Sequence, residues 1–539
     1  MQRNCKEIKS ELNQRQLKMI KLKIDNKEIS VPKGTSILEA AKELGIHIPS
    51  MCYLKGYGNH PSCMLCMVKD KKTGQLHPSC AYPAQEGLEI ITNDAEVRES
   101  RKDALELLLS DHVGDCEAPC RIACPAFMDI PEMNRLIAAG KSIEALKLVK
   151  EEIALPLVLG YVCSAPCENA CRRKAIDNPV SICQLKKHVA LADANSDTAY
   201  LPEKEISTGK KIAIIGAGVA GLSAAFHLTK SGFACTVFDK NEKAGGALLN
   251  TDQPKELPSE VLEKEISILE KFGIEFQLNK NIDSKSLVQL KLDYGAVIIA
   301  SGEFNADLKE SFGLKLNAKN TGFEVVDGFF TTSEANVFVC GSAIKVQKMA
   351  VRALSQGKAA AYFISNLLKS GEEKVEYRMF NSKFGKLQTE EYSEYLKEAI
   401  SDNRFEPDKE LDGFANEMAI EEAKRCLRCD CRKPKTCKLR IYADEYGAKQ
   451  KQYQFGERKL VQKIYTHETI VYEVEKCIRC GLCVDITQKE KELTGLTYIG
   501  RGFDVRIGIP FNESLQKSLE KTAIKCAESC PTGAISLKY

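Results

Sequence analysis

The chain has 539 residues, of which 44% are hydrophobic and 28% are charged, and its formal net charge is +3. A chain of this length and composition is expected to fold into about two to five globular domains. The small net charge gives no reason to expect a nucleic-acid or membrane-surface partner. No segment approaches the roughly 20 apolar residues of a membrane-spanning helix, and the polar N-terminus lacks the apolar core of a secretory signal. The sequence therefore predicts a cytoplasmic protein without a transmembrane segment.

Cysteine is the most informative residue type, since the chain contains 23 of them. In a long chain without an export signal, these cysteines are not expected to form disulfides. They also fall into five sequence groups with the short internal spacings of chains that bind iron–sulfur clusters. Metal binding and redox chemistry are therefore expected.

The first group has the spacing C-x10-C-x2-C-x13-C and follows an alternating apolar pattern typical of a β-hairpin. Three ligands on one loop and a fourth farther along suit a four-thiolate [2Fe–2S] cluster, and a zinc site is the alternative. The motifs MCYLKGYGNHPSCMLCMV and HPSCAYP resemble the β-grasp ferredoxin domain of the respiratory NADH dehydrogenase large subunit and of iron-only hydrogenases. The expected ligands are Cys52, Cys63, Cys66 and Cys80.

Two further motifs, DHVGDCEAPCRIACP and VCSAPCENAC, contain three cysteines each at steps of four. They resemble the N-terminal two-cluster domain of the glutamate synthase small subunit and of dihydropyrimidine dehydrogenase, in which ligands from both motifs interleave. The resemblance implies one [4Fe–4S] cluster on Cys116, Cys120 and Cys171, and a second on Cys124, Cys163 and Cys167.

Each of these two clusters needs a fourth ligand that departs from the family pattern. His112 stands four residues before Cys116, and this H-x3-C element is similar to the His-ligated cluster of the NADH dehydrogenase large subunit. The family's last ligand is a Gln or Glu, but Lys186 occupies the matching position and cannot ligate. Cys183 lies one helical turn earlier and is the expected replacement. The alternatives are a surface or capping role for His112 and a structural role for Cys183.

The segment KKIAIIGAGVAGLSAAFHL predicts a strand, a glycine turn and a helix, followed by a second strand that ends in an acid. Such a turn binds a pyrophosphate at the helix N-terminus, and the acid accepts hydrogen bonds from the ribose. The expected dinucleotide-binding residues are Gly216, Gly218, Gly221, Asp239, Gly245 and Gly246.

Two later motifs resemble the remaining FAD signatures of glutathione-reductase-like flavoproteins. They are YGAVIIASGEF, which contains Gly302, and TTSEANVFVCGSAIKVQKMAVRALSQGKAA, which contains Gly341 and Ser342. Ser342 replaces the Asp that contacts the ribityl–phosphate portion of FAD in that family. Only 28 residues separate Gly302 from Thr331, where the family inserts a nicotinamide-binding domain. So short a bridge cannot form a βαβ unit, so we expect FAD and no NAD(P)H site.

Two cysteine groups remain near the C-terminus. The motif AKRCLRCDCRKPKTCKLR is expected to hold one [4Fe–4S] cluster or one zinc ion through Cys426, Cys429, Cys431 and Cys437. The motifs EKCIRCGLC and CAESCPTGA resemble a bacterial-type ferredoxin with one cluster on Cys477, Cys480, Cys483 and Cys530. Cys526 has no partners for a second cluster and is expected to be a relic.

The expected fold class is multidomain, α/β and α+β. The expected domains are an N-terminal extension (1–18), a [2Fe–2S] β-grasp domain (19–100), a helical double [4Fe–4S] domain (101–201), an FAD domain without a nicotinamide insertion (205–370), a linker with a cysteine-rich cluster motif (371–445) and a ferredoxin-like [4Fe–4S] domain (446–539).

Together these motifs predict an oxidoreductase with FAD, one [2Fe–2S] cluster and about four [4Fe–4S] clusters. The combination resembles electron-transfer subunits of NADH-, ferredoxin-, hydrogen- or formate-linked complexes of anaerobes, some of which are electron-bifurcating. No catalytic side chain can be named, because the cofactors carry such chemistry. The alternatives are a self-sufficient flavin enzyme acting on a small organic substrate and an assembly protein with structural clusters.

Overall fold

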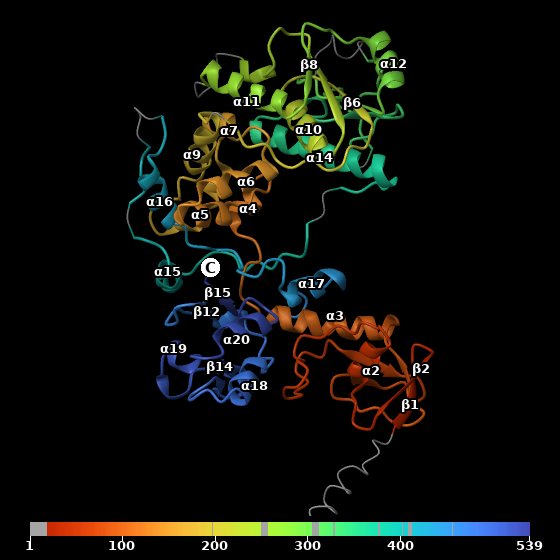
Figure 1. Cartoon of the computed structure of the whole chain (residues 1–539), viewed down its shortest axis with the longest axis vertical. Helices are drawn as coiled ribbons and strands as arrows, with labels where there is room; N and C mark the ends of the chain where they lie inside the picture. The colour runs from red at the N-terminus through yellow and green to blue at the C-terminus, as the bar shows by residue number, and fades with distance from the viewer. Residues whose placement is uncertain are drawn as a thin grey trace, which may run out of the picture. The chain divides into compact units, whose positions relative to one another are not determined.

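The structure is a computed structural model that describes residues 19–196, 198–249, 257–303, 312–326, 329–375, 378–401, 403–407, 412–454 and 456–538. The expected N-terminal extension and Cys5 lie outside these residues. The chain forms two compact units. The first contains the described residues up to Glu117 together with Met379–Lys397 and those from Asp430 onward, and the second contains Ala118–Arg378 and Glu398–Cys429. The second unit is thus inserted into the sequence of the first, as the colour bar of Figure 1 lets the reader follow.

The N-terminal part of the first unit is a five-stranded sheet of order β2-β1-β5-β3-β4. Its strands are β1 (Met19–Ile24), β2 (Lys27–Pro32), β3 (Met67–Asp70), β4 (Leu76–Pro78) and β5 (Glu89–Ile91). The β1–β2 hairpin turns at Asp25 and Asn26, both with positive φ, as a two-residue hairpin turn requires. Helix α2 (Ile37–Glu43) begins at Ser36, whose hydroxyl accepts a hydrogen bond from the Glu39 N–H, and packs its apolar side on this sheet.

Helix α3 (Ala95–Ser110) joins this sheet to α17 (Lys438–Glu445) within the same unit. The buried Arg101 donates hydrogen bonds to the carbonyls of Met67 and Thr92, at 2.7 and 2.9 Å, and to the Tyr446 hydroxyl at 3.0 Å. A buried guanidinium with all these acceptors fixes α3 between the sheet and the C-terminal residues of the unit.

The C-terminal part of the first unit is built on the antiparallel strands β12 (Ile470–Glu473) and β15 (Ile535–Leu537). The other elements are β11 (Lys463–Ile464), α18 (Leu482–Lys489), β13 (Thr497–Ile499), β14 (Arg506–Gly508), α19 (Leu515–Ser518) and α20 (Ala523–Ser529). Helix α15 (Tyr392–Leu396) also belongs to this unit. Helices α18 and α20 pack with the sheet around a core that includes Ile486, Leu496 and Ile535.

The second unit begins with a helical domain. Its helices are α4 (Pro119–Ala123), α5 (Ile130–Ala138), α6 (Ser142–Glu152), α7 (Pro156–Val162), α8 (Pro166–Asn169) and α9 (Ile182–Ala194). The returning helix α16 (Asn416–Lys424) packs against α5. Just after it, Arg425 is fully buried and pairs with Glu422 at 2.9 Å and with Asp177 at 3.1 Å. This ion-pair network holds the 398–429 segment on the helical domain.

The remainder of the second unit is a parallel sheet of order β10-β9-β6-β7-β8 with helices around it. Its elements are β6 (Lys211–Ile215), α10 (Val219–Lys230), β7 (Ala234–Phe238), α11 (Ser259–Lys271), β8 (Glu275–Gln277), α12 (Ser284–Asp293), β9 (Ala296–Ile299), β10 (Val337–Val339) and α14 (Ala350–Ser370). Between β9 and β10, the described residues contribute two isolated bridges, Leu316–Phe323 and that of Thr331 with Phe338 of β10.

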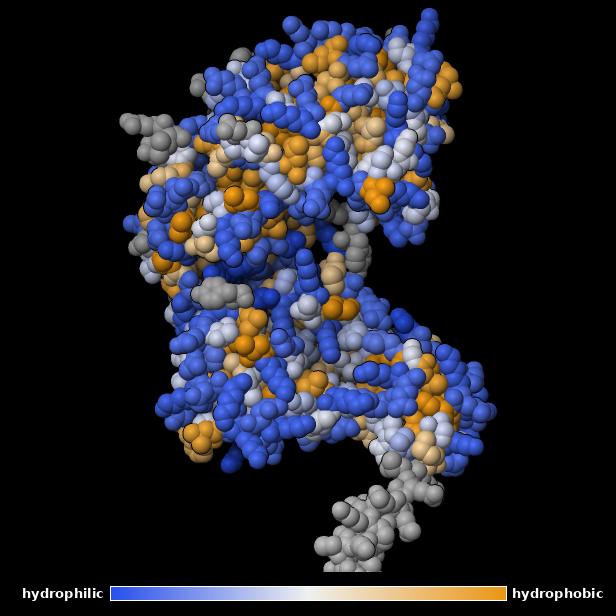
Figure 2. Space-filling model, in the orientation of Figure 1, coloured by the Kyte–Doolittle hydropathy of each residue, from blue (hydrophilic) through white to orange (hydrophobic). Residues whose placement is uncertain are grey.

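In the view of Figure 2, hydrophilic residues cover most of the visible surface. Within the described ranges, none of the helices has the length and apolar character needed to cross a bilayer. The mixture of α/β and α+β parts confirms the expected fold class.

Candidate cluster and dinucleotide sites

The first cysteine set lies on the N-terminal sheet, where a hairpin brings two of its members together. Cys66 directly precedes β3 and Cys80 closely follows β4, and Met67 pairs with Pro78 across the two strands. The thiols converge, because Cys52 is hydrogen-bonded to both Cys63 and Cys80, which lowers its pKa. Hydrogen bonding to Cys80 lowers the pKa of Cys66 to about 7. Four buried, converging thiols fit the expected [2Fe–2S] site.

The second set lines a small cavity in the helical domain. Its members are Cys124, Cys163, Cys167 and Cys183. Cys183 is on α9, and its thiol is hydrogen-bonded to Cys163. Its backbone N–H donates to Glu168 at 2.9 Å, which fixes the start of α9 beside α8. The structure thus brings the expected replacement ligand Cys183 to the three cysteines of the family motif.

Lys186 lies in the wall of the same cavity. Burial alone would lower the pKa of this lysine, but the nearby thiolates of Cys183, Cys163, Cys167 and Cys124 raise it above the ordinary value. Lys186 is therefore positively charged at neutral pH and faces the cysteine set.

A third set forms where α16 returns to the helical domain. Cys120 and Cys171 line a second small cavity together with Cys426 and Cys429. The pKa of Cys120 is raised by burial and then by the other three thiolates. The geometry gives four cysteines around one cavity, as a [4Fe–4S] cluster requires.

The fourth set lies in the first unit. Cys116, Cys431 and Cys437 interact electrostatically, and the Cys431 N–H donates to the Cys116 carbonyl at 3.2 Å. His112 stands one turn of chain before Cys116, and the buried Lys476 acts on both His112 and Cys431. Burial raises the pKa of Cys116 to about 11 and that of Cys437 to about 12. Thiols with such raised pKa values become thiolates only when a cation, such as the iron of a cluster, balances their negative charge. This set of donors therefore fits a cluster.

The imidazole of His112 is suited to act as a ligand in this set. Burial, followed by the charge of Lys476, lowers its pKa to about 4, so the ring is neutral at physiological pH. Its Nδ1 atom is buried without a hydrogen-bond partner. A neutral imidazole with a free buried nitrogen has the chemistry of a metal ligand.

These positions correct two of the expected groupings. Cys116 does not join Cys120 and Cys171, and the Cys426–Cys437 motif does not hold one cluster or one zinc ion. The physical reason is that the chain passes from the second unit to the first between Cys429 and Asp430. Each half of the motif therefore completes a different set. Local spacing alone carries no signal for this division.

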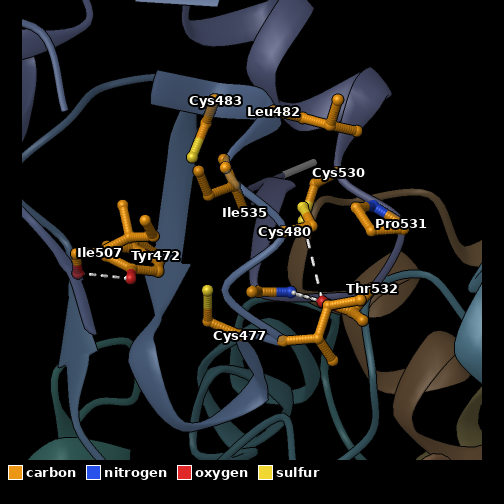
Figure 3. A pocket seen from close by; sticks show the side chains of 13 residues that line it. Tyr472, Cys477, Cys480, Leu482, Cys483, Ile507, Cys530, Pro531, Thr532 and Ile535 are labelled. Atoms are coloured by element: carbon orange, nitrogen blue, oxygen red, sulfur yellow. Dashed lines mark hydrogen bonds between the residues drawn. The ribbon is translucent and has the colours of Figure 1, made fainter. Parts of the chain in front are cut away.

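The fifth set is that of the ferredoxin-like part. Cys477, Cys480, Cys483 and Cys530 line one cavity with Tyr472 and Pro531. Figure 3 shows the sulfur atoms of Cys477 and Cys483 directed toward the space between them. Cys480 and Cys530 lie to the right of these two residues in the same view. Burial raises the pKa of Cys477 to about 11. Cys526 is buried in the core of this domain, outside the residues that line the cavity.

A left-handed backbone conformation recurs two residues after a cysteine in three of these sets. Arg479, Ala165 and Arg428 each stand two residues after a cysteine and have φ near 50°, namely 54°, 49° and 48°. At the first two positions, the backbone N–H points at the preceding cysteine sulfur, at 3.3 and 3.4 Å. Left-handed non-glycine residues carry strain that concentrates at functional sites, and N–H groups aimed at sulfur stabilise a bound cluster.

The glycine turn of the parallel sheet has the geometry expected of a dinucleotide site. Gly216 has φ +111°, and a Cβ there would collide with the Ala300 carbonyl. At Gly221 a Cβ would collide with the Gly216 carbonyl, so the turn and the helix can meet only without side chains. Asp239 follows β7 and accepts a hydrogen bond from the Ala217 N–H at 2.7 Å. A Cβ at Gly246 would come within 2.9 Å of Gly218, so this loop lies against the turn.

The later glycines lie at the same edge of the sheet. Gly302 follows β9 and has φ +86°, and Gly341 follows β10, where a Cβ would approach Ala220 of α10 at 2.7 Å. Ser342 uses its hydroxyl to accept a hydrogen bond from the Gln347 N–H at 3.1 Å. Gly357 of α14, which lies in the second FAD-like motif but was not among the expected site residues, is also required here, because a Cβ would collide with the Ala220 carbonyl. A bare backbone at this crossing allows α14 to pack on the start of α10.

Comparison with known proteins gives three domain matches. A model of a 2Fe-2S iron-sulfur cluster binding domain matches residues 17–95, and one of dihydropyrimidine dehydrogenase domain II, 4Fe-4S cluster, matches 94–198. A model of an NAD(P)-binding Rossmann-like domain matches 214–280. These matches confirm that the chain has [2Fe–2S] and [4Fe–4S] domains.

The chain is also similar to subunits of known oxidoreductases. It is 37% identical over 207 residues to the NADP(+)-dependent formate dehydrogenase subunit beta of Moorella thermoacetica, covering 34% of this chain and 29% of that protein. It is 34% identical over 203 residues to the glutamate synthase [NADPH] small chain of Bacillus subtilis, covering 35% and 40%. Among solved structures, an NAD+-reducing [NiFe]-hydrogenase has 30% identity over 22% of this chain and 49% of that chain, with a TM-score of 0.17.

The matches cover less than half the length of each of these proteins. They nevertheless confirm the expected resemblance to the glutamate synthase small subunit. The chain combines a 2Fe-2S domain, a 4Fe-4S domain and a Rossmann-like nucleotide-binding domain, and its homologues are oxidoreductase subunits.

Proposed function

We propose that this chain is an electron-transfer subunit of a multi-subunit oxidoreductase and holds one [2Fe–2S] cluster, four [4Fe–4S] clusters and one FAD. The observation that carries the proposal is the gathering of the 19 expected cysteine ligands into five sets, with His112 four residues before Cys116 of one set, in a chain that also has a dinucleotide-binding turn. When bound, FAD exchanges one or two electrons and each cluster exchanges one, so the chain links hydride-type and single-electron chemistry.

The roles of the chain's own residues follow from their positions. The first cysteine set, which includes Cys66, holds the [2Fe–2S] cluster. His112 completes the ligand set of Cys116, Cys431 and Cys437. In the Rossmann-like domain, the turn from Gly216 to Gly221 lies at the N-terminus of α10, where backbone N–H groups receive the pyrophosphate. Asp239 orients the ribose.

The bound dinucleotide is FAD and not a nicotinamide. The motifs around Gly302 and Gly341 extend the first glycine turn into the signatures of FAD-binding proteins, and the 28 residues from Gly302 to Thr331 are too few for a second nucleotide domain. Nicotinamide and terminal substrate sites therefore lie on partner subunits. We propose that these partners are NADH-, ferredoxin-, hydrogen- or formate-linked subunits in the cytoplasm of an anaerobe. The relative named as an NADP(+)-dependent formate dehydrogenase subunit supports the formate-linked case.

Isolation of the native assembly under anaerobic conditions tests this function. We expect the chain to co-purify with at least one other oxidoreductase subunit, and the assembly to turn over a substrate that the isolated chain does not. Recovery of the chain alone, with full turnover of a small organic substrate at its own flavin, would instead show a self-sufficient enzyme.

A further inference from the structure

Lys186 is an exception among the buried lysines of the described residues. Its side chain is 5% exposed, as little as those of Lys150, Lys187, Lys463 and Lys476. Each of those four pairs with a carboxylate, namely Asp193, Asp412, Glu473 and Glu473. Lys186 pairs with no carboxylate among the residues described. A buried ammonium without a counter-charge is costly, so another anion must face it.

The geometry identifies where that anion belongs. The Lys186 Nζ donates one hydrogen bond, to the Leu159 carbonyl at 3.1 Å, although an ammonium has three donors. Lys186 and Cys183 stand three residues apart on α9 and both face the cavity of the second cysteine set. Besides these two residues and the other three cysteines, the cavity is lined by Met128, Ile130, Ile153, Pro166, Ile182 and Val351. Among the described residues that line this cavity, Lys186 is thus the only charged side chain, and apart from the cysteines the lining is apolar.

We propose that Lys186 supplies the fixed positive charge that balances the anionic four-thiolate cluster at Cys124, Cys163, Cys167 and Cys183, and that it thereby raises the reduction potential of this cluster. Four thiolates leave a [4Fe–4S] cluster negatively charged, and reduction adds a further negative charge. A cation at fixed distance in an apolar cavity stabilises the reduced form more than the oxidised form. This inference rests on the proposed function, since it requires a cluster at this site.

The nearby carboxylates cannot take over this role. Glu168 faces the N-terminus of α9 but pairs with Arg404 at 3.0 Å. Glu265 is buried and accepts hydrogen bonds from the Leu157 and Val158 N–H groups, at 2.9 and 2.8 Å, and the charge of Lys186 acts on it without a direct ion pair between the two. Both are anionic when ionised, so neither can compensate the thiolates.

Lys187 provides a matched control on the same helix. It is as buried as Lys186, but its Nζ lies 2.9 Å from Asp412 and 3.7 Å from the centre of the Tyr161 ring, and it does not line the cavity. Lys187→Met removes a buried charge one residue away without changing the lining of the cluster site. Lys186→Met removes the charge from the cavity at nearly constant side-chain volume, and Lys186→Arg keeps it.

The experiment is an EPR-monitored redox titration of the anaerobically prepared full chain, with iron counted in each variant. The signal of this cluster is the one lost in Cys183→Ala. We expect Lys186→Met to keep its iron and to shift that signal to a more negative midpoint potential, with the native value largely restored in Lys186→Arg and unchanged in Lys187→Met. Loss of the cluster in Lys186→Met but not in Lys186→Arg would also support the charge requirement.

Two outcomes would overturn the inference: an unchanged midpoint in Lys186→Met, or loss of the cluster in both Lys186 variants, which would show a packing role. Cys183→Ala separates this result from failure of the proposed function. If it leaves both iron content and spectra unchanged, Cys183 is not a cluster ligand, and the proposed four-cysteine set fails whatever the Lys186 variants show.

Discussion

Cys429 and Cys431 are separated by a single residue, yet they belong to different cysteine sets. Cys429 lines a cavity with Cys120, Cys171 and Cys426, whereas Cys431 interacts with Cys116 and Cys437. The chain leaves the inserted unit between these two cysteines. A sequence motif with the spacing of a single site thus supplies cysteines to two sites.

This division predicts how cysteine variants combine. Cys429→Ser and Cys431→Ser should each remove one [4Fe–4S] cluster, about four iron atoms of an expected total of about 18. The pair Cys429→Ser with Cys120→Ser should lose no more iron than either alone, because both belong to one cluster. The pair Cys429→Ser with Cys431→Ser should lose about eight. Iron analysis and EPR of anaerobic samples measure these losses. If Cys429→Ser with Cys431→Ser lost only one cluster, and Cys429→Ser with Cys120→Ser lost two, the motif would instead bind a single cluster.

The ligand role of His112 predicts a change in potential without loss of the cluster. In His112→Cys, a thiolate replaces a neutral imidazole and adds one negative charge, so the midpoint potential of that cluster should fall. Redox titration followed by EPR measures the shift. His188→Cys is a suitable control, because His188 is a buried histidine whose ring contacts the Phe414 carbonyl and no cysteine set. This variant should leave the potential unchanged. An unchanged potential in His112→Cys would exclude ligation.

Two glycines of the dinucleotide turn should respond differently to alanine. At Gly221 a Cβ collides with the Gly216 carbonyl, so Gly221→Ala should destabilise the fold by roughly 1–3 kcal/mol, the usual cost of overpacking. At Gly218 the nearest atom to a new Cβ is the Gly246 Cα at 4.0 Å, so the apoprotein should tolerate Gly218→Ala. The added methyl group should still obstruct the pyrophosphate and lower FAD affinity. Thermal denaturation and bound-flavin analysis of both variants test this, and equal stability losses would contradict it.

Glu265 predicts a pH dependence of stability. Burial raises its pKa from 4.5 to about 7. Because the folded protein holds this proton more tightly, the stabilisation is fully present below pH 4.5 and is lost as the pH rises through about 7. The change corresponds to about 3 kcal/mol at most. Denaturant midpoints measured from pH 5 to 8 should fall with rising pH in the wild type and should fall less in Glu265→Gln, which has no carboxyl group to titrate. The same pH dependence in both proteins would contradict the raised pKa of Glu265.

The sequence predicted the members of the sites better than their grouping. Short spacings identified Cys52 to Cys80 and Cys477 to Cys530 as complete sets, because those ligands lie on neighbouring loops of one domain. The prediction for Cys183 followed from its position one helical turn before Lys186, and that for His112 from the resemblance of its H-x3-C element to a His-ligated cluster. Nothing local could join Cys116 to Cys431, since an entire unit is inserted between them and the match depends on long-range packing.

The buried charges were equally beyond local patterns. In the sequence, Arg425 is only one of several basic residues beside a cysteine motif. In the structure it is fully buried and pairs with Glu422 and Asp177, and this pairing holds the neighbouring Cys426 on the helical domain. From the sequence alone, Lys186 is only a residue that cannot ligate a cluster. Its importance depends on a cavity that forms when α7, α8 and α9 pack.

The central claim, that clusters and one FAD share this chain without a nicotinamide site, is tested most directly by anaerobic reductive titration of the isolated protein. With dithionite or a reduced ferredoxin, the account predicts uptake of about seven electrons, one for each of five clusters and two for FAD. NADH or NADPH should not reduce the flavin rapidly unless a partner subunit is added. Uptake of only about two electrons, or fast bleaching of the flavin by NADH or NADPH in the isolated chain, would contradict it.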